Sequence, residues 1–412
     1  MDMDPDLVIL VGNSRGWGLT YYNTVLALGI RRAGIPLVVV STPSEQSPGL
    51  HERLRGTGIH VVDDPGLEVR ELASVRRAAE TIASVSRPGR NVVHCGGIRH
   101  SVAARFAAAF APKGNRIIVT TSVGALHNGS RIWPLYYFLG SLTLNLASHK
   151  VLTLCGRELR KMRRFGLMRS KSSVNYFWID QDSFSEGQAG PSELQYAFPD
   201  SRIEDLNVPK VIYLAQFYGQ KGHIPLIQAW KAIVQRDHRL LLVLAGSGPL
   251  EPRCKLLATE LEISDRICFL PRVPREVVPH LLRHCAFAVV TSKAETFGSC
   301  IVEPLLAGLP VCTTHVGIGE ELAAADGVRL INETSPKHIA ASLSSLLDSF
   351  PTELERMRRG RDWVIENCSV DRAVARLARV WRVAGLSGQS SGEAEGSLRR
   401  CLLEGKYDDR GQ

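Results

Sequence analysis

The chain has 412 residues, more than one hydrophobic core usually supports, so two domains are expected. Its 44% of apolar residues describe an ordinary soluble globular protein. The nine cysteines are scattered and form no CxxC pair or Cys/His cluster, which argues against a disulfide framework and a zinc site and favours reduced thiols in a cytosol. The acidic start MDMDPDLVILVG lacks the basic and long apolar regions of a secretory signal, so we expect a cytoplasmic protein.

Positive charge is concentrated in the first half of the chain. Residues 1–184 hold 23 Lys and Arg against 13 Asp and Glu, a net +10, whereas residues 185–412 hold 27 against 28, a net −1; together they give the total of +9. This asymmetry predicts an anionic partner, which can be a membrane surface, a nucleic acid or a phosphate-bearing substrate. A solvated basic surface with no partner is the alternative.

Short apolar runs alternate with helix-like stretches over residues 1–184, which predicts a first domain with a doubly wound parallel sheet. The expected strands are Leu7–Val11, Pro36–Ser41, His60–Val62, Asn91–His94, Ile117–Thr121, Val151–Leu154 and Ser173–Phe177. A helix is expected over Leu19–Ala33. Residues 185–208 are polar, contain Gly and Pro, and are interpreted as an interdomain linker.

The same alternation resumes over residues 209–370 and predicts a second domain of the same class. The expected strands are Val211–Ala215, Leu240–Ala245, Ile267–Leu270, Ala286–Val290 and Pro310–Thr314, and the expected helices are His223–Arg236, Pro249–Leu261, Val277–His284 and one opened by Gly298. Residues 352–384 indicate charged amphipathic helices broken near Cys368. We expect residues 371–385 to form a C-terminal helix that packs back on the first domain, and 386–412 to be disordered. The predicted architecture is two α/β domains that face each other across a cleft.

The segment from Ala286 to Leu322 carries the clearest chemical signal. Glu295 lies in the loop after an apolar strand, Gly298 opens a helix, and Glu303 lies one turn inside that helix. Carboxylates can bind sugar or ribose hydroxyls, and the amides of Phe297–Cys300 at a helix start suit a phosphate. We therefore predict a site for a sugar joined to a phosphate. A capped helix with a solvated Glu303 is the alternative.

Two loops at the ends of earlier strands add to this prediction. Lys221 follows the strand that ends near Ala215, and its ammonium can neutralise a diphosphate, although a surface lysine at a helix start is the alternative. The turn Gly246-Ser247-Gly248-Pro249 lies where open α/β sheets bind ligands.

The loop after the first strand, GNSRGWG, has Gly12, Gly16 and Gly18 spaced as in the dinucleotide fingerprint of short-chain dehydrogenases. That function also requires a tyrosine four residues before a lysine, and none of the nine tyrosines has one. Gly16 and Gly18 are better explained as places where backbone approaches a ligand.

Residues 131–171 are a candidate membrane contact. No Lys, Arg, Asp or Glu occurs from Ile132 to His149, aromatic residues cluster early in this run, and seven basic residues lie in 157–171. The run is short for a membrane span but suits peripheral contact with anionic lipid. A core helix followed by an ordinary basic helix is the alternative. The basic and aromatic residues do not interleave as in a nucleic-acid platform, so no nucleic-acid partner is expected.

Taken together, these motifs resemble the retaining glycosyltransferases of the GT-B fold, family 4 or group 1, which have two Rossmann-like domains and a glutamate–seven–glutamate motif. The segment from Glu295 to Val311 is similar to the family pattern E-x-F-G-x-x-x-x-E-A-x-A-x-G-x-P-V. The resemblance covers residues 7–384 and includes Gly16-Trp17-Gly18, Lys221-Gly222 and Gly246-Ser247-Gly248 in the expected order.

The resemblance implies roles for individual residues. Glu303 would hold the nucleotide ribose and Glu295 would approach the donor sugar. Lys221 and the amides of Phe297, Gly298, Ser299 and Cys300 would hold the diphosphate, so that no cofactor or metal ion is needed. Gly16, Gly18, Gln216, Gly246 and Val273 would complete the donor site, with Val273 in a loop near the base.

Three departures from the family pattern concern the leaving group and the acceptor. Gln216 stands five residues before Lys221, where the family usually has an arginine. The Pro-Asn-Gly before an aspartate near the domain junction is replaced by the residues that precede Asp180. The family histidine after the Ile117–Thr121 type of strand is replaced by Ser122, with His94 and His127 nearby, so these three are the candidate acceptor-side residues.

The sequence thus predicts a metal-independent, retaining hexosyl-type glycosyltransferase. It would use a UDP- or GDP-sugar and a glycan or lipid-linked acceptor in polysaccharide or glycolipid biosynthesis, in the cytoplasm or peripherally on the cytoplasmic face of a membrane. A non-catalytic partner subunit that binds a sugar nucleotide is the main alternative, and a GT-B epimerase or phosphorylase is a weaker one.

Overall fold

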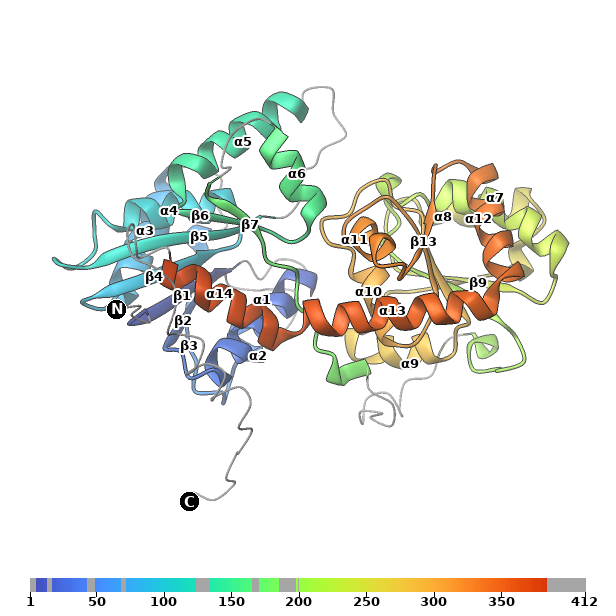
Figure 1. Cartoon of the computed structure of the whole chain (residues 1–412), viewed down its shortest axis with the longest axis horizontal. Coiled ribbons are helices and arrows are strands. Elements are labelled where there is room, and N and C mark those ends of the chain that lie inside the picture. The colour runs from blue at the N-terminus through green and yellow to red at the C-terminus, as the bar shows by residue number, and fades with distance from the viewer. Residues whose placement is uncertain are drawn as a thin grey trace, which may run out of the picture. The chain divides into compact units, whose positions relative to one another are not determined.

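The computed structural model describes residues 5–12, 17–42, 49–67, 72–123, 133–164, 170–184, 198 and 200–383. They form two compact units (Figure 1). The first comprises described residues of Met1–Ile179 and Cys368–Gln412, and the second those of Asp180–Asn367. The division therefore falls after Ile179 and before Cys368, rather than at the expected 184 and 370. Of the expected linker, residues 200–208 belong to the second unit; the expected disordered tail lies outside the described residues.

The first unit contains a seven-stranded parallel sheet in the order β3-β2-β1-β4-β5-β6-β7. Its strands are β1 (Leu7–Gly12), β2 (Leu37–Ser41), β3 (His60–Asp63), β4 (Arg90–Cys95), β5 (Arg116–Val123), β6 (Lys150–Thr153) and β7 (Ser172–Val174). Every residue of β1 is buried, as expected for a central parallel strand with helices on both faces. The helices are α1 (Trp17–Arg32), α2 (Leu50–Arg53), α3 (Leu72–Val85), α4 (Ile98–Ala107), α5 (Trp133–Ala147), α6 (Gly156–Arg164) and α14 (Val370–Val383).

Helix α14 belongs to the first unit although it follows the second in sequence. The indole of Trp381 is fully buried and donates a hydrogen bond to Thr120 Oγ1 on β5 at 3.2 Å. Arg90 donates to the Trp381 carbonyl at 3.0 Å, and Arg376 donates to Asn175 Oδ1 at 3.0 Å. Helix α14 also packs against α1. The amphipathic helix expected over 371–385 is thus held on the first unit by its apolar face and by polar contacts at its edges.

The second unit contains a six-stranded parallel sheet in the order β10-β9-β8-β11-β12-β13. Its strands are β8 (Lys210–Leu214), β9 (Leu241–Ala245), β10 (Ile267–Leu270), β11 (Phe287–Val290), β12 (Val311–Thr314) and β13 (Arg329–Ile331). The helices are α7 (His223–Arg236), α8 (Glu251–Glu260), α9 (Val278–Arg283), α10 (Ser299–Leu306), α11 (Gly319–Ala324), α12 (Pro336–Asp348) and α13 (Phe350–Cys368). Both units are therefore doubly wound α/β structures, which confirms the expected fold class.

The order of the strands marks where each sheet can bind a ligand. In the second unit the chain winds outwards from β8 through β9 to β10, and then returns to add β11, β12 and β13 on the other side. The topological switch point lies between β8 and β11, and open α/β sheets bind ligands at the carboxyl ends of the strands on either side of such a point. In the first unit the equivalent point lies between β1 and β4.

Candidate active site

The two predicted catalytic residues meet at the switch point of the second unit. Lys221 ends the turn after β8, and Glu295 lies in the loop after β11. Lys221 Nζ is 2.6 Å from Glu295 Oε1, and the two side chains are only 19% and 12% exposed. Lys221 is therefore not the solvated surface lysine that the sequence alone allowed.

Glu295 Oε1 accepts two further hydrogen bonds. Ser292 Oγ donates to it at 2.6 Å and Cys300 Sγ at 3.8 Å. Burial, together with the Glu295 carboxylate, raises the pKa of the Cys300 thiol, so Cys300 remains a protonated donor. Because these contacts all fall on Oε1, Oε2 has no hydrogen-bond partner among the described residues and is available to a hydroxyl group.

Side chains from β8 and from the residues that directly follow β11 hold the Lys221 loop in place. The buried Tyr213 hydroxyl donates to the Lys221 carbonyl at 2.7 Å and lies 2.7 Å from Ser292 Oγ. Thr291 Oγ1 lies 3.1 Å from the Gly222 carbonyl. Burial raises the pKa of Tyr213, so its hydroxyl keeps its proton. Tyr213, Thr291 and Ser292 were not predicted from the sequence; the position of Ser292 three residues before Glu295 was the only local signal.

The N-terminus of α10 points its first amides into the same loop region. Gly298 precedes the helix with φ 97°, a left-handed conformation that L side chains rarely adopt, and no side chain caps the helix there. The amides of the first residues of a helix have no partner within the helix and carry partial positive charge. Ser299 and Cys300 begin α10, so this end presents an anion-binding environment beside Lys221 and Glu295.

Glu303 is buried rather than solvated. Its side chain is 5% exposed, and Oε1 lies 2.8 Å from Nη2 of Arg275, which comes from the turn after β10. The contact is an ion pair without hydrogen-bond geometry, and Oε1 accepts no hydrogen bond from the described residues. A buried carboxylate oxygen in this state is costly unless a further donor reaches it. Glu303 is thus an acceptor well suited to a hydroxyl donor. Arg275 was not predicted from the sequence.

The remaining donor-side residues lie at the carboxyl ends of neighbouring strands. Gln216 is exposed in the loop after β8, and Val273 is half-buried in the loop after β10. Gly246 directly follows β9, and a Cβ there would lie 2.1 Å from the Ala215 carbonyl oxygen, so only glycine lets the β8 and β9 loops approach this closely. These loops line the same edge of the sheet as Lys221.

In the first unit, two of the predicted acceptor-side residues form a buried hydrogen-bonded row. His94 on β4 is 1% exposed and Ser122 on β5 is 7% exposed. His94 Nε2 lies 3.0 Å from Ser122 Oγ, and Nδ1 lies 2.9 Å from Thr120 Oγ1. Trp381 lies edge-on to the His94 ring. The row runs from Thr120 through His94 to Ser122, and Ser122 is the more exposed of its two ends.

Burial lowers the pKa of His94 to about 4, so the folded protein keeps the ring neutral while the unfolded chain takes up a proton below a pH of about 6.5. The free energy of unfolding should therefore fall on acidification, by about 2 kcal/mol between pH 7.5 and pH 5 from this residue. Burial also lowers the pKa of His223 in the second unit to about 4. His223 therefore adds a further fall in the free energy of unfolding on acidification. Denaturant midpoints measured across this pH range should show a shallower fall for His94→Gln than for the exposed-site control His238→Gln. Equal falls of the denaturant midpoint in His94→Gln and His238→Gln would contradict the lowered pKa of His94.

Two of the predicted residues, Gly16 and His127, lie outside the described residues. Gly18 was expected in the loop after the first strand, but it lies in the first turn of α1, which begins at Trp17. The helix thus starts two residues earlier than expected.

Residues 198–363 match the family model of the glycosyl transferases group 1. Among curated proteins, the chain is 32% identical over 144 residues to the uncharacterized glycosyltransferase YqgM of Bacillus subtilis, which covers 35% of this chain and 39% of that protein. It is 30% identical over 201 residues to the D-inositol 3-phosphate glycosyltransferase of Mycolicibacterium smegmatis, covering 46% of this chain and 42% of that protein. The chain thus spans less than half the length of these two relatives.

The fold extends over nearly the whole chain. The structure of Anabaena Alr3699/HepE in complex with UDP and glucose superposes with a TM-score of 0.73 at 15% identity, over 93% of this chain and all of that one. The two units therefore have the fold of GT-B glycosyltransferases, and the part of the chain that carries Lys221, Glu295 and Glu303 is similar in sequence to the glycosyl transferases group 1.

Proposed function

We propose that this protein is a retaining glycosyltransferase that moves a hexose-type sugar from a UDP- or GDP-sugar to a glycan or lipid-linked acceptor. The observation that supports this most strongly is the grouping of two cations (Lys221 and Arg275), the largely buried carboxylates of Glu295 and Glu303, and a helix N-terminus at the switch point of the second unit. A nucleoside-diphosphate sugar offers the matching groups: a diphosphate, a ribose diol and sugar hydroxyls.

Each group of the site has a role in this proposal. Glu303 accepts hydrogen bonds from the ribose through Oε1, which accepts none from the described residues although it pairs with Arg275. The amides at the start of α10 and the Lys221 ammonium bind the diphosphate and stabilise the charge that develops on it as it leaves. Glu295 Oε2 accepts from a hydroxyl of the donor sugar. Since these cationic and dipolar groups take the leaving-group charge, the proposal requires no metal ion.

Bond making and bond breaking occur on one face of the sugar. The bond from the anomeric carbon to the diphosphate oxygen breaks as the bond to the acceptor oxygen forms, and the acceptor proton passes to the departing phosphate. The anomeric configuration is thereby retained. The His94–Ser122 row would lie on the acceptor side, with Ser122 as the group that an acceptor hydroxyl meets.

A lipid-linked acceptor would bring the enzyme to a membrane surface, and the basic first half of the chain favours peripheral association with the cytoplasmic face of the membrane. Synthesis of a polysaccharide or glycolipid is the corresponding cellular role. Among the described residues, no helix has the length and apolar character needed to cross a bilayer.

One observation favours a second function, that of a non-catalytic subunit that binds a sugar nucleotide. Gln216 is exposed and neutral, and it stands where the family that these motifs resemble usually has an arginine, so the diphosphate would meet less positive charge. Such a subunit would bind the nucleotide through the same residues and turn over no donor.

The test is a turnover assay with purified protein and a panel of UDP- and GDP-sugars, combined with titration calorimetry. The proposal expects at least one donor to be consumed, with transfer to an added glycan or lipid-linked acceptor. Tight nucleotide binding without consumption of any donor would favour the non-catalytic subunit. Release of a free epimerised sugar, or turnover that depends on added phosphate, would favour an epimerase or phosphorylase.

A further inference from the structure

Exposed apolar side chains gather on two neighbouring helices of the first unit. Helices α4 and α5 pack against each other (Figure 1). Ten large apolar side chains are well exposed in the described part of the chain, and six of them are on or directly after these two helices, at 38–68% exposure. These six, which we name the α4–α5 ridge, are Phe106, Phe110, Leu135, Phe138, Leu139 and Leu146.

The spacing within α5 shows that the ridge is one continuous side of the helix. Leu135, Leu139 and Leu146 follow one another at intervals of four and seven residues and so lie on one stripe. Gly140 and Leu144, which lie on the opposite side, are buried against the unit. Helix α5 is therefore apolar on both sides, a pattern typical of helices that are covered by protein or by lipid. Here Leu135, Leu139 and Leu146 on the outer side are exposed in the described part of the chain.

The charge around the ridge indicates what covers it. Residues 81–179 contain fifteen Lys and Arg and a single acidic residue, Glu158. Glu158 is buried, and its carboxylate is 2.7 Å from Lys161 Nζ, so it adds no exposed negative charge. Arg99 and Arg105 on α4 and Arg160 on α6 are among the exposed basic residues. An apolar ridge set in a basic surface is complementary to an anionic phospholipid bilayer, which offers acyl chains below negative headgroups.

We propose that the α4–α5 ridge docks the protein on an anionic phospholipid membrane. Helix α5 has 15 residues, or about 22 Å at 1.5 Å per residue, shorter than the roughly 30 Å hydrocarbon core. It therefore lies in the plane of the headgroups with its outer leucines at the acyl boundary. The surface includes α4, which lies outside the 131–171 segment that the sequence pattern indicated.

A second copy of the chain is a poorer occupant of the ridge. A symmetric contact through this face would place two strongly basic surfaces against each other, and like charges oppose such an interface. A nucleic acid would match the charge but would leave the apolar ridge uncovered. The combination of apolar and basic groups is what selects the bilayer.

The test is co-sedimentation of the full chain with vesicles of pure phosphatidylcholine and with vesicles that contain phosphatidylglycerol. The triple variant Leu135→Ser/Leu139→Ser/Leu146→Ser removes the outer side of α5. The matched control Leu206→Ser/Leu256→Ser/Ile365→Ser changes three exposed apolar residues of the second unit. We expect the native chain and the control to bind the anionic vesicles, and the α5 variant to bind at least about tenfold more weakly.

Binding should also fall with added salt and should be weak on phosphatidylcholine alone. Equal loss in the two triple variants, or equal binding to both kinds of vesicle, would overturn the proposal. The proposal would also be overturned if the ridge instead joined two copies of the chain. In that case the native chain would be a dimer that does not bind vesicles, and the α5 variant would be monomeric. Turnover of a water-soluble donor should be unchanged in both variants, so a failure here is distinguishable from a failure of the proposed transferase function.

Discussion

Replacing Glu295 with Gln should lower kcat for donor turnover by about 10²- to 10³-fold while the chain remains folded. The substitution keeps the shape of the side chain but removes the charge opposite Lys221, 2.6 Å away, and replaces one acceptor oxygen with an amide donor, so a single oxygen remains to accept from Ser292, Lys221 and a sugar hydroxyl. The ammonium would then be held by fewer groups, and the carboxamide could not reproduce the hydrogen bonds that an ionised carboxylate makes to a sugar hydroxyl.

The division of the effect between kcat and KM makes this test specific. Glu295 would act on the sugar as it departs, so kcat should fall more than KM rises. Glu333→Gln, which changes an exposed glutamate of the same unit, is the control and should have native kinetics. Turnover of the Glu295→Gln variant within about twofold of the native rate would reject the proposed role.

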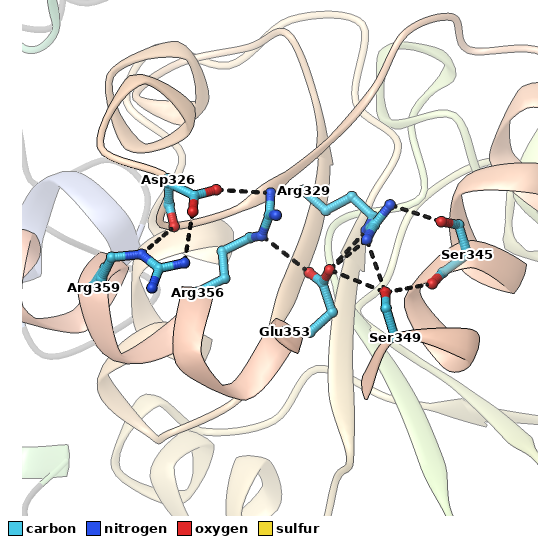
Figure 2. Close-up of polar contacts among 7 residues, drawn as sticks. All are labelled: Asp326, Arg329, Ser345, Ser349, Glu353, Arg356 and Arg359. Atoms are coloured by element: carbon cyan, nitrogen blue, oxygen red, sulfur yellow. Dashed lines mark hydrogen bonds and ion pairs between the residues drawn. The ribbon is translucent and has the colours of Figure 1, made fainter. Parts of the chain in front are cut away.

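Replacing Glu353 with Ala should destabilise the second unit by about 3–5 kcal/mol. Figure 2 shows why: Glu353 on α13 lies between Arg329 of β13 and Arg356 one turn further along α13. The carboxylate is 1% exposed, and Arg329 Nε donates to its Oε1 at 3.1 Å. Removing it leaves two guanidinium groups in a partly buried place without their shared counter-charge.

The network ties together the last three elements of the second unit. Arg329 also donates to Ser345 Oγ on α12 at 2.9 Å, and Arg356 Nη1 is 3.0 Å from Asp326 Oδ1, just before β13 (Figure 2). Glu355→Ala is the matched control, because Glu355 lies two residues further along the same helix but is 59% exposed. Denaturant unfolding, with amide hydrogen exchange to assign the loss to β13, α12 and α13, measures the effect. Similar losses of unfolding free energy in Glu353→Ala and Glu355→Ala would show that the buried ion pairs of Glu353 are unimportant for stability.

Much of the fold is predictable from local patterns, because buried parallel strands are short apolar runs between turn residues. The bounds of α7 and β10 agree with those expected from the sequence, and the break near Cys368 separates α13 from α14. Elements with weaker patterns were not predicted individually. Strand β13 has three residues and only one of them is buried, so its apolar run is too short to stand out.

The candidate site was predictable only where its residues follow one another in a motif. Glu295, Gly298 and Glu303 share one loop and helix, so their spacing carries information. Arg275 reaches Glu303 from the turn after β10, and nothing in the local sequence around Arg275 indicates that contact. For the same reason the sequence indicated charged amphipathic helices over 352–384 but could not indicate that Glu353 is buried, since that depends on Arg329 from another element.

The most direct measurement of the central claim is amide hydrogen exchange of the full chain with and without UDP and GDP. If the switch point of the second unit holds a nucleoside diphosphate, at least one of the two should slow exchange in peptides that cover 216–222 and 295–303, and Glu303→Gln should weaken that protection. Binding seen by calorimetry, with protection confined to other segments of the chain, would contradict the assignment of the site.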